Sequence, residues 1–212
     1  MTWLANNADM IGELFGAHLA IALPAILLAV VLSIPLGWLA HSNRVVHGPL
    51  LAAIGLLYAI PSFAMFILVP SLFGFDLRSS ANIILVLAIY GVAILVRTVS
   101  DAFDAVPEDV QRAADACGYS PWKRFWAVDL PLAVPVTMAG VRVVVVSTIS
   151  LVTVGSVIGV RSLGTLFTDG FQRGIVPEVV TGLALTVVLA IAMDALCVLL
   201  ERLLAPWARR RA

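Results

Sequence analysis

Residues 112–135, RAADACGYSPWKRFWAVDLPLAVP, form a charged and aromatic stretch between two strongly apolar runs of the chain. Pro107 precedes the stretch with the fixed φ of a first helical position, and the two acidic residues after it stand where the helix dipole favours negative charge. Gly118 predicts the end of that helix, because glycine best tolerates the left-handed conformation just past a helix C-terminus. Ser120 and Pro121 then predict an N-cap and a first-turn proline. The stretch is therefore expected to hold two short helices joined by a glycine turn.

The second of these helices is expected to be amphipathic and aromatic. Its bulky apolar face lies opposite a basic face, with Trp122, Phe125 and Trp126 set against Lys123 and Arg124. Leu130 and Pro131 are expected to close the unit before the next apolar run. Such a unit is typical of a docking element for a protein outside the membrane; the alternative is an amphipathic loop that lies on lipid headgroups.

The composition of the whole chain excludes a water-soluble domain. Of its 212 residues, 61% are hydrophobic and 12% are charged, and the mean hydropathy is +1.05, whereas soluble domains are about half apolar and about a quarter charged. The formal net charge is zero, and no surface for nucleic acid is indicated. The composition predicts an all-α integral membrane protein that crosses the bilayer several times.

Apolar runs long enough to cross a bilayer, about 20 residues, occur at residues 16–40, 49–74, 81–100, 133–160 and 178–203, within a single transmembrane domain at 1–212. Basic residues are concentrated on one side of these five predicted spans: Arg44, Arg97, Arg112, Lys123, Arg124, Arg202, Arg209, Arg210 and Arg211, against Arg78, Arg161 and Arg173 on the other. The positive-inside rule then predicts an N-terminus outside, and a loop at 101–130 and a C-terminus in the cytoplasm. The N-terminus lacks the positive n-region of a signal peptide, so the first span is expected to be retained.

No motif for catalysis or cofactor binding occurs in the sequence. There is no GxxxxGK[ST] phosphate-binding loop, so nucleotide hydrolysis is expected on a separate polypeptide. Cys117 and Cys197 are expected to be free thiols, and His18, His41 and His47 are not spaced as metal ligands. Neither GxSxG nor HExxH is present, which leaves an intramembrane enzyme as a remote alternative. We expect no catalytic residue, metal or cofactor in this chain.

Two features within the spans are candidates for a path through the membrane. Pro61 and Ser62 place a helix breaker and a hydroxyl in the second span, where protein or water must satisfy the freed backbone groups. Asp194 is an acidic residue deep in an apolar run, and intramembrane carboxylates are usually turned inward and partnered. A role toward a cationic solute and a structural hydrogen bond, to a neighbouring helix or to Arg142, both fit Asp194.

Other prolines and glycines bear on the shape of the spans. Pro24, Pro35, Pro70 and Pro135 indicate bent helices. Gly155 and Gly159 form a GxxxG pair, which predicts close helix approach, either inside the chain or at a subunit interface.

The spacing of residues 112–131 resembles the cytoplasmic loop of ATP-binding-cassette importer permeases. The signature of that family is Glu-Ala-Ala, three residues, Gly, nine residues, Ile, one residue and Leu-Pro. The matching positions here are Ala113, Ala114, Gly118, Val128, Leu130 and Pro131, whereas Arg112 stands in place of the glutamate. The resemblance implies a coupling loop, residues 101–130, that docks on an ATPase through Arg112, Ala113, Ala114, Asp115, Gly118, Tyr119, Ser120, Trp122, Leu130 and Pro131.

Beyond the coupling loop, nearly the whole chain is similar to the small permeases of osmoprotectant importers. The likeness is carried by short segments: Ile34-Pro35-Leu36-Gly37, Ala59-Ile60-Pro61-Ser62, Val69-Pro70, Leu130 to Arg142, Val157-Ile158-Gly159 and Ser162-Leu163-Gly164. It implies import of glycine betaine, choline, carnitine or proline. Methionine-type permeases share the size, the loop and the five-span plan and are the runner-up, while the Ile-Pro-Ser of the second span favours osmoprotectants.

The same likeness implies the partners and the location. ATPase subunits would bind ATP and Mg and hold the coupling loop, a second permease, identical or paralogous, would complete the path, and an extracytoplasmic solute-binding protein would deliver the solute. The complex would lie in the inner membrane of a prokaryote.

Overall fold

The computed structural model describes residues 2–74 and 76–207, so the expected basic residues Arg209, Arg210 and Arg211 lie outside it. Within those ranges the regular structure is helical throughout: α1 (Thr2–Asn6), α2 (Ala8–Ser42), α3 (Arg44–Ala59), α4 (Ser62–Phe73), α5 (Ser80–Asp104), α6 (Glu108–Ala116), α7 (Pro121–Arg124), the π-helical η1 (Phe125–Asp129), α8 (Leu130–Val152), the 3₁₀-helical η2 (Thr153–Ile158), α9 (Gly164–Arg173) and α10 (Val176–Leu204). The all-α membrane fold predicted from composition is confirmed.

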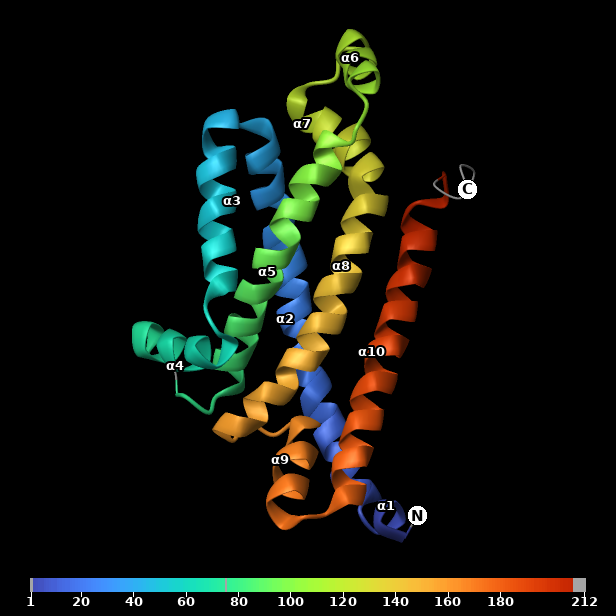
Figure 1. The fold of residues 1–212 in the computed structure, drawn as a ribbon. Helices are drawn as coiled ribbons and strands as arrows, with labels where there is room; N and C mark the ends of the chain where they lie inside the picture. Colours follow the sequence, from blue (N-terminus) through green and yellow to red (C-terminus); the bar gives the residue numbers. More distant parts are fainter. Residues whose placement is uncertain (1, 75, 208–212) are drawn as a thin grey trace.

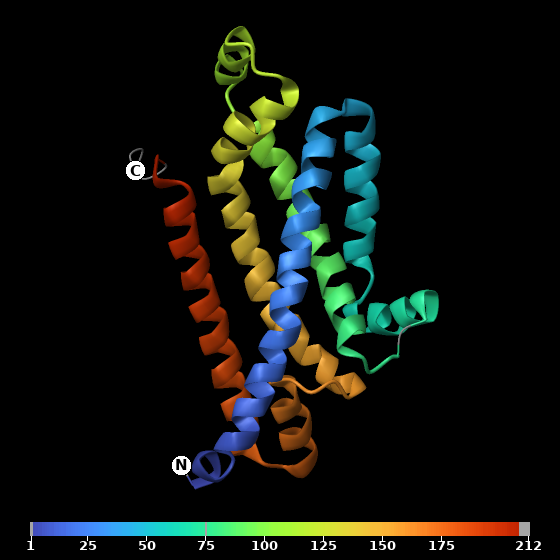
Figure 2. The ribbon, with the colours of Figure 1, turned by 180° about the vertical axis from the view of Figure 1, so that it is seen from behind.

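The long helices lie side by side in one elongated bundle (Figure 1). Helix α5 is central and packs against α2, α3, α4 and α8. Seen from behind, α2 covers α5 and α8 (Figure 2). Helix α10 stands at one edge, where it packs against α8 and α9.

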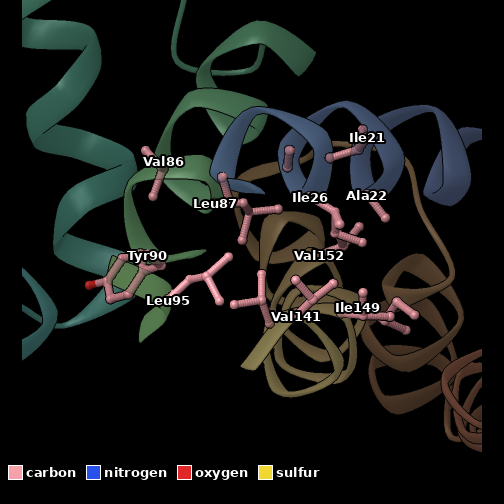
Figure 3. Packing of buried hydrophobic residues seen from close by; sticks show 14 of the residues in the cluster. Ile21, Ala22, Ile26, Val86, Leu87, Tyr90, Leu95, Val141, Ile149 and Val152 are labelled. Carbon is pink, nitrogen blue, oxygen red and sulfur yellow. The ribbon is translucent and has the colours of Figure 1, made fainter. Parts of the chain in front are cut away.

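Aliphatic side chains from α2, α5 and α8 fill the centre of the bundle (Figure 3). Ile21, Leu87 and Ile149 represent the three helices in this cluster, and each is at most 2% exposed. Helices also approach closely through glycine: a Cβ added at Gly91 would lie 2.5 Å from the Cβ of Ala29. Small residues at such crossings are what membrane helices need for tight packing.

Four of the predicted spans are helices long and apolar enough to cross a bilayer, and the fifth is broken. The predicted span at 49–74 corresponds to α3 and α4, which are long and apolar enough for a span together but meet at 107°. Ile60 has extended backbone (φ −71°, ψ 130°), the conformation favoured before a proline, and its carbonyl accepts a hydrogen bond from the Tyr90 hydroxyl. Bending is therefore confirmed at Pro61, whereas Pro24, Pro35, Pro70 and Pro135 lie inside helices.

The predicted span at 133–160 ends close to where it was expected, at Ile158. The α-helix stops at Val152 and tightens into η2, which is followed by Gly159 with φ +89°. Gly155 is buried, and a Cβ there would make only ordinary contact with Ile83 at 3.5 Å. Gly155 therefore lies against α5, whereas Gly159 ends η2 and faces the Arg78 side chain; a role of the pair at a subunit interface stays a prediction.

The basic residues lie at the two ends of the bundle in the groups that the sequence predicts. Arg44, the α6–α7 region and Arg202 lie at one end, and Arg78, Arg161 and Arg173 lie at the end that holds α4 and α9 (Figure 1). Arg97 lies within α5, about two turns before the helix ends at Asp104.

Candidate functional site

The α6–α7 pair projects from one end of the bundle and contains most of the residues predicted to dock a partner (Figure 1). Helix α6 ends at Ala116, Cys117 is its C-cap, and Gly118 follows with φ +79°. The Gly118 amide donates to Asp115 O over 3.0 Å and the Tyr119 amide donates to Ala114 O over 3.1 Å. These two bonds define a Schellman C-cap, which confirms the predicted glycine turn.

Helix α7 begins as predicted and is anchored to the bundle by its aromatic residues. Ser120 caps it, accepting from the Lys123 amide over 3.3 Å, and Pro121 occupies the first turn. Phe125 is buried, with ring centroids 5.3 Å from Trp38 of α2 and 5.8 Å from Phe103 of α5. The aromatic helix is therefore fixed to two membrane helices at once.

Leu130 and Pro131 do not close a separate unit as expected. Helix α7, η1 and α8 follow one another without a break, so Pro121–Ile158 forms one long helical element. Proline is tolerated there because Pro131 occupies the first turn of α8, and the backbone upstream widens into a π turn. The second loop helix is thus the outer end of a membrane span.

Arg124 links the two loop helices through acidic partners. Its Nη1 donates to both carboxylate oxygens of Asp115, over 2.9 and 2.8 Å, and its Nε donates to Asp129 over 3.3 Å. Bidentate guanidinium–carboxylate pairs hold a fixed geometry. Arg124 therefore holds α6 against the end of the α8 span, and it was missing from the predicted site although Asp115 was included.

The outer surface of the loop carries two exposed tryptophans among charged residues. Trp122 is 66% exposed and Trp126 is 54% exposed, with the two rings edge to face at 5.7 Å. Arg112 is also exposed, and it pairs with two carboxylates of α6, Glu108 at 3.2 Å and Asp109 at 3.1 Å. Ala113 is also exposed, whereas Ala114 is buried in the loop itself. Exposed tryptophans are typical of a protein-binding surface.

The structure does not bring the three predicted path residues together. Pro61 and Ser62 lie at the corner between α3 and α4, not in the middle of a continuous span. Asp194 lies on α10, and α4 and α10 occupy opposite edges of the bundle in both views (Figures 1 and 2). Residues on these two helices belong to different faces of this chain.

Asp194 is paired with Arg142, one of the two alternatives left open by the sequence. Arg142 Nε donates to Asp194 Oδ1 over 2.7 Å, and Nη2 donates to Oδ2 over 2.8 Å. The pair joins α8 to α10 and lines a groove of about 440 Å³ with Ala139, Val143, Val146 and Ser147. The sequence alone could not predict the bidentate geometry of the Arg142–Asp194 pair, because the two residues are 52 positions apart.

Apolar helical spans and a projecting two-helix loop define an integral membrane protein, and comparison with known proteins identifies its family. The chain belongs to the binding-protein-dependent transport system inner membrane component family, whose profile matches residues 29–210. It is therefore a multi-pass inner-membrane permease subunit of an ABC importer. Members of this family work with ATPase and solute-binding partners.

Two curated relatives match almost the whole chain. It is 31% identical to the osmoprotectant import permease protein OsmW of Salmonella typhimurium over 206 residues, which cover 96% of each chain. It is 26% identical to the choline transport system permease protein OpuBD of Bacillus subtilis over 212 residues, which cover 100% of this chain and 92% of the relative. The expected likeness to osmoprotectant permeases is confirmed.

A solved structure shares the fold. The MetNI methionine ABC transporter in an inward-facing crystal form matches with a TM-score of 0.81 at 19% identity, covering 96% of this chain and 97% of the other. At that identity the likeness concerns the fold alone.

Proposed function

We propose that this permease subunit imports an osmoprotectant such as glycine betaine, choline, carnitine or proline. The observation that supports this most strongly is the match to OsmW along almost the full length of both chains. The fold likeness to the methionine transporter MetNI makes methionine the second candidate. It is the weaker one, because several solutes are carried on one fold and solute choice depends on the site.

We further propose that the end of the bundle with α6 and α7 is cytoplasmic and docks on a separate ATPase, which binds ATP and Mg. The basic residues at that end support this orientation under the positive-inside rule. The coupling residues are Arg112, Ala113, Ala114, Asp115, Gly118, Tyr119, Ser120, Trp122, Leu130 and Pro131. Of these, Trp122 offers the largest exposed apolar side chain.

The remaining partners follow from the same proposal. An extracytoplasmic solute-binding protein delivers the solute at the end that holds α4 and α9, and a second permease, identical or paralogous, completes the path. Pro61, Ser62 and Asp194 are proposed to line that path. ATP binding closes the ATPase pair and moves the loop, and the attached spans reorient.

Uptake of labelled glycine betaine, choline, proline and methionine tests the solute class. Cells with and without this chain are compared at high and low osmolarity. Loss of glycine betaine, choline or proline uptake, with methionine uptake intact, is the expected result. Loss of methionine uptake alone transfers the assignment to the second candidate.

A further inference from the structure

Arg142 and Asp194 form a charged pair far from the ends of their helices. Arg142 lies twelve residues from the start of α8 at Leu130, and Asp194 lies ten residues from the end of α10 at Leu204. At 1.5 Å per residue, these positions are about 18 Å and about 15 Å from the same end of the bundle. The hydrocarbon core is about 30 Å thick, so the pair lies near the middle of the membrane.

The pair is matched in charge but not enclosed by this chain. The Arg142 side chain is 40% exposed and the Asp194 side chain is 31% exposed. Both face the groove between α8 and α10, whose other lining residues are small or aliphatic except Ser147. In the most apolar 18-residue stretch of α10, only 11% of the residues are buried inside the chain.

Contact with lipid would be energetically unfavourable for the exposed side of the Arg142–Asp194 pair. Ionised side chains at mid-membrane depth are expensive to expose to hydrocarbon, and they usually face a bundle interior or a water-filled cavity. A pair that served only to join α8 and α10 would be expected to be covered by its own helices. The exposed guanidinium and carboxylate instead face a groove large enough for a small solute.

We infer that Arg142 and Asp194 form a solute site on the translocation path and that this site takes a zwitterion. The inference rests on the proposed function and specifies its solute. The carboxylate of the solute takes the place of Asp194 on the Arg142 fork, and its cationic group takes the place of Arg142 beside Asp194. One ion pair is thereby exchanged for two, with no charge left unmatched.

The same exchange is unfavourable for a solute that carries only a positive charge. A cation such as choline pairs with Asp194 but leaves Arg142 without a counter-charge, and an unpaired charge away from water is strongly destabilising. The site therefore favours glycine betaine or proline over choline.

Equilibrium binding of labelled glycine betaine and choline to the purified permease–ATPase complex, without the solute-binding protein, tests this site. The native complex is expected to bind glycine betaine at least tenfold more tightly than choline. Arg142→Gln should weaken glycine betaine binding at least tenfold and raise the ratio of choline to glycine betaine binding, because Asp194 is then free for a cation. Asp194→Asn should weaken the binding of both solutes.

A double variant and a second ion pair serve as controls. The double variant carries both Arg142→Gln and Asp194→Asn, which removes both charges but keeps a hydrogen-bonded link between α8 and α10. This variant should assemble normally and still lose glycine betaine binding. Arg161→Gln breaks the exposed pair with Glu13, whose atoms lie 3.1 Å apart, and should leave binding unchanged.

Each outcome separates this inference from the proposed function. If the double variant binds and imports glycine betaine at the native level, the inference is overturned. The Arg142–Asp194 pair is then only a structural link between α8 and α10. A native importer that carries none of the osmoprotectants in cells would overturn the proposed function itself. If the Arg142→Gln variant binds glycine betaine as tightly as the native complex does, the zwitterion site is also rejected.

Discussion

Gly118→Val tests whether the glycine turn of the coupling loop sets the geometry that the ATPase binds. Gly118 has φ +79°, and no heavy atom lies within 4 Å of the Cβ that a side chain would add. The substitution therefore introduces backbone strain without a clash. A left-handed conformation costs an L-residue about 1–2 kcal/mol, which lowers the equilibrium constant for forming the native turn by about 5- to 30-fold.

The effect should appear in partner binding and not in the stability of the bundle. Gly118 is exposed at the tip of the loop, so the thermal midpoint of the purified permease is expected to stay at the native value. Affinity for the ATPase subunit, measured by titration of the ATPase onto immobilised permease, should fall by the same 5- to 30-fold. Solute uptake by the complete importer should fall with it.

Two matched variants separate turn geometry from side-chain bulk and from general strain. Gly118→Asn should bind the ATPase nearly as well as the native chain, because asparagine tolerates the left-handed region. Gly74→Val has the same kind of strain, at φ +72° with open space around its Cβ, but lies at the α4 end and should leave ATPase affinity unchanged. Native affinity of Gly118→Val, or an equal loss in Gly74→Val, would refute the reasoning.

Three further substitutions divide the loop into a binding surface and an anchor. Trp122→Ala should weaken ATPase binding by about 2 kcal/mol, as expected of a central interface tryptophan, with an unchanged thermal midpoint; unchanged binding would remove Trp122 from the interface. Phe125→Ala should lower the free energy of unfolding by about 3–5 kcal/mol, because a buried ring between α2 and α5 is lost. Denaturant titration in detergent measures this loss, and an unchanged free energy of unfolding would show that Phe125 does not anchor the loop. Arg124→Gln should free Asp115, and with it α6, from α7 and raise proteolysis of the loop, with Lys123→Gln as the control; equal protection of both variants would show that the pair does not hold α6.

The local structure of the loop was predictable because its signals are short-range. Glycine at the C′ position and serine before proline determine a helix end and a helix start through neighbouring atoms alone. The predicted cap at Gly118 and the N-cap at Ser120 were confirmed for that reason. The boundary predicted at Leu130 failed, because proline in the first turn of α8 needs only a local widening of the backbone.

The features that were missed depend on contacts between distant segments. Apolar composition shows that residues 49–74 avoid water, but it does not distinguish a straight helix from two helices at 107°. That corner needs the Tyr90 hydroxyl to satisfy the Ile60 carbonyl, from a helix that lies 30 residues further along. Likewise, the groove beside Asp194 arises only from the packing of α8 against α10.

The connection from α7 to α8 joins the two proposed sites mechanically. Arg142 lies on the same unbroken helical element as Trp122, with only the π turn of η1 between them. Asp194 lies on α10, which packs against α8 and α9 and stands at the edge of the bundle. A force applied at α7 therefore reaches Arg142 along its own helix, whereas it reaches Asp194 only across side-chain contacts. Tilting α8 against α10 would separate the guanidinium from the carboxylate, so movement of the loop and opening of the solute site are expected to be one event.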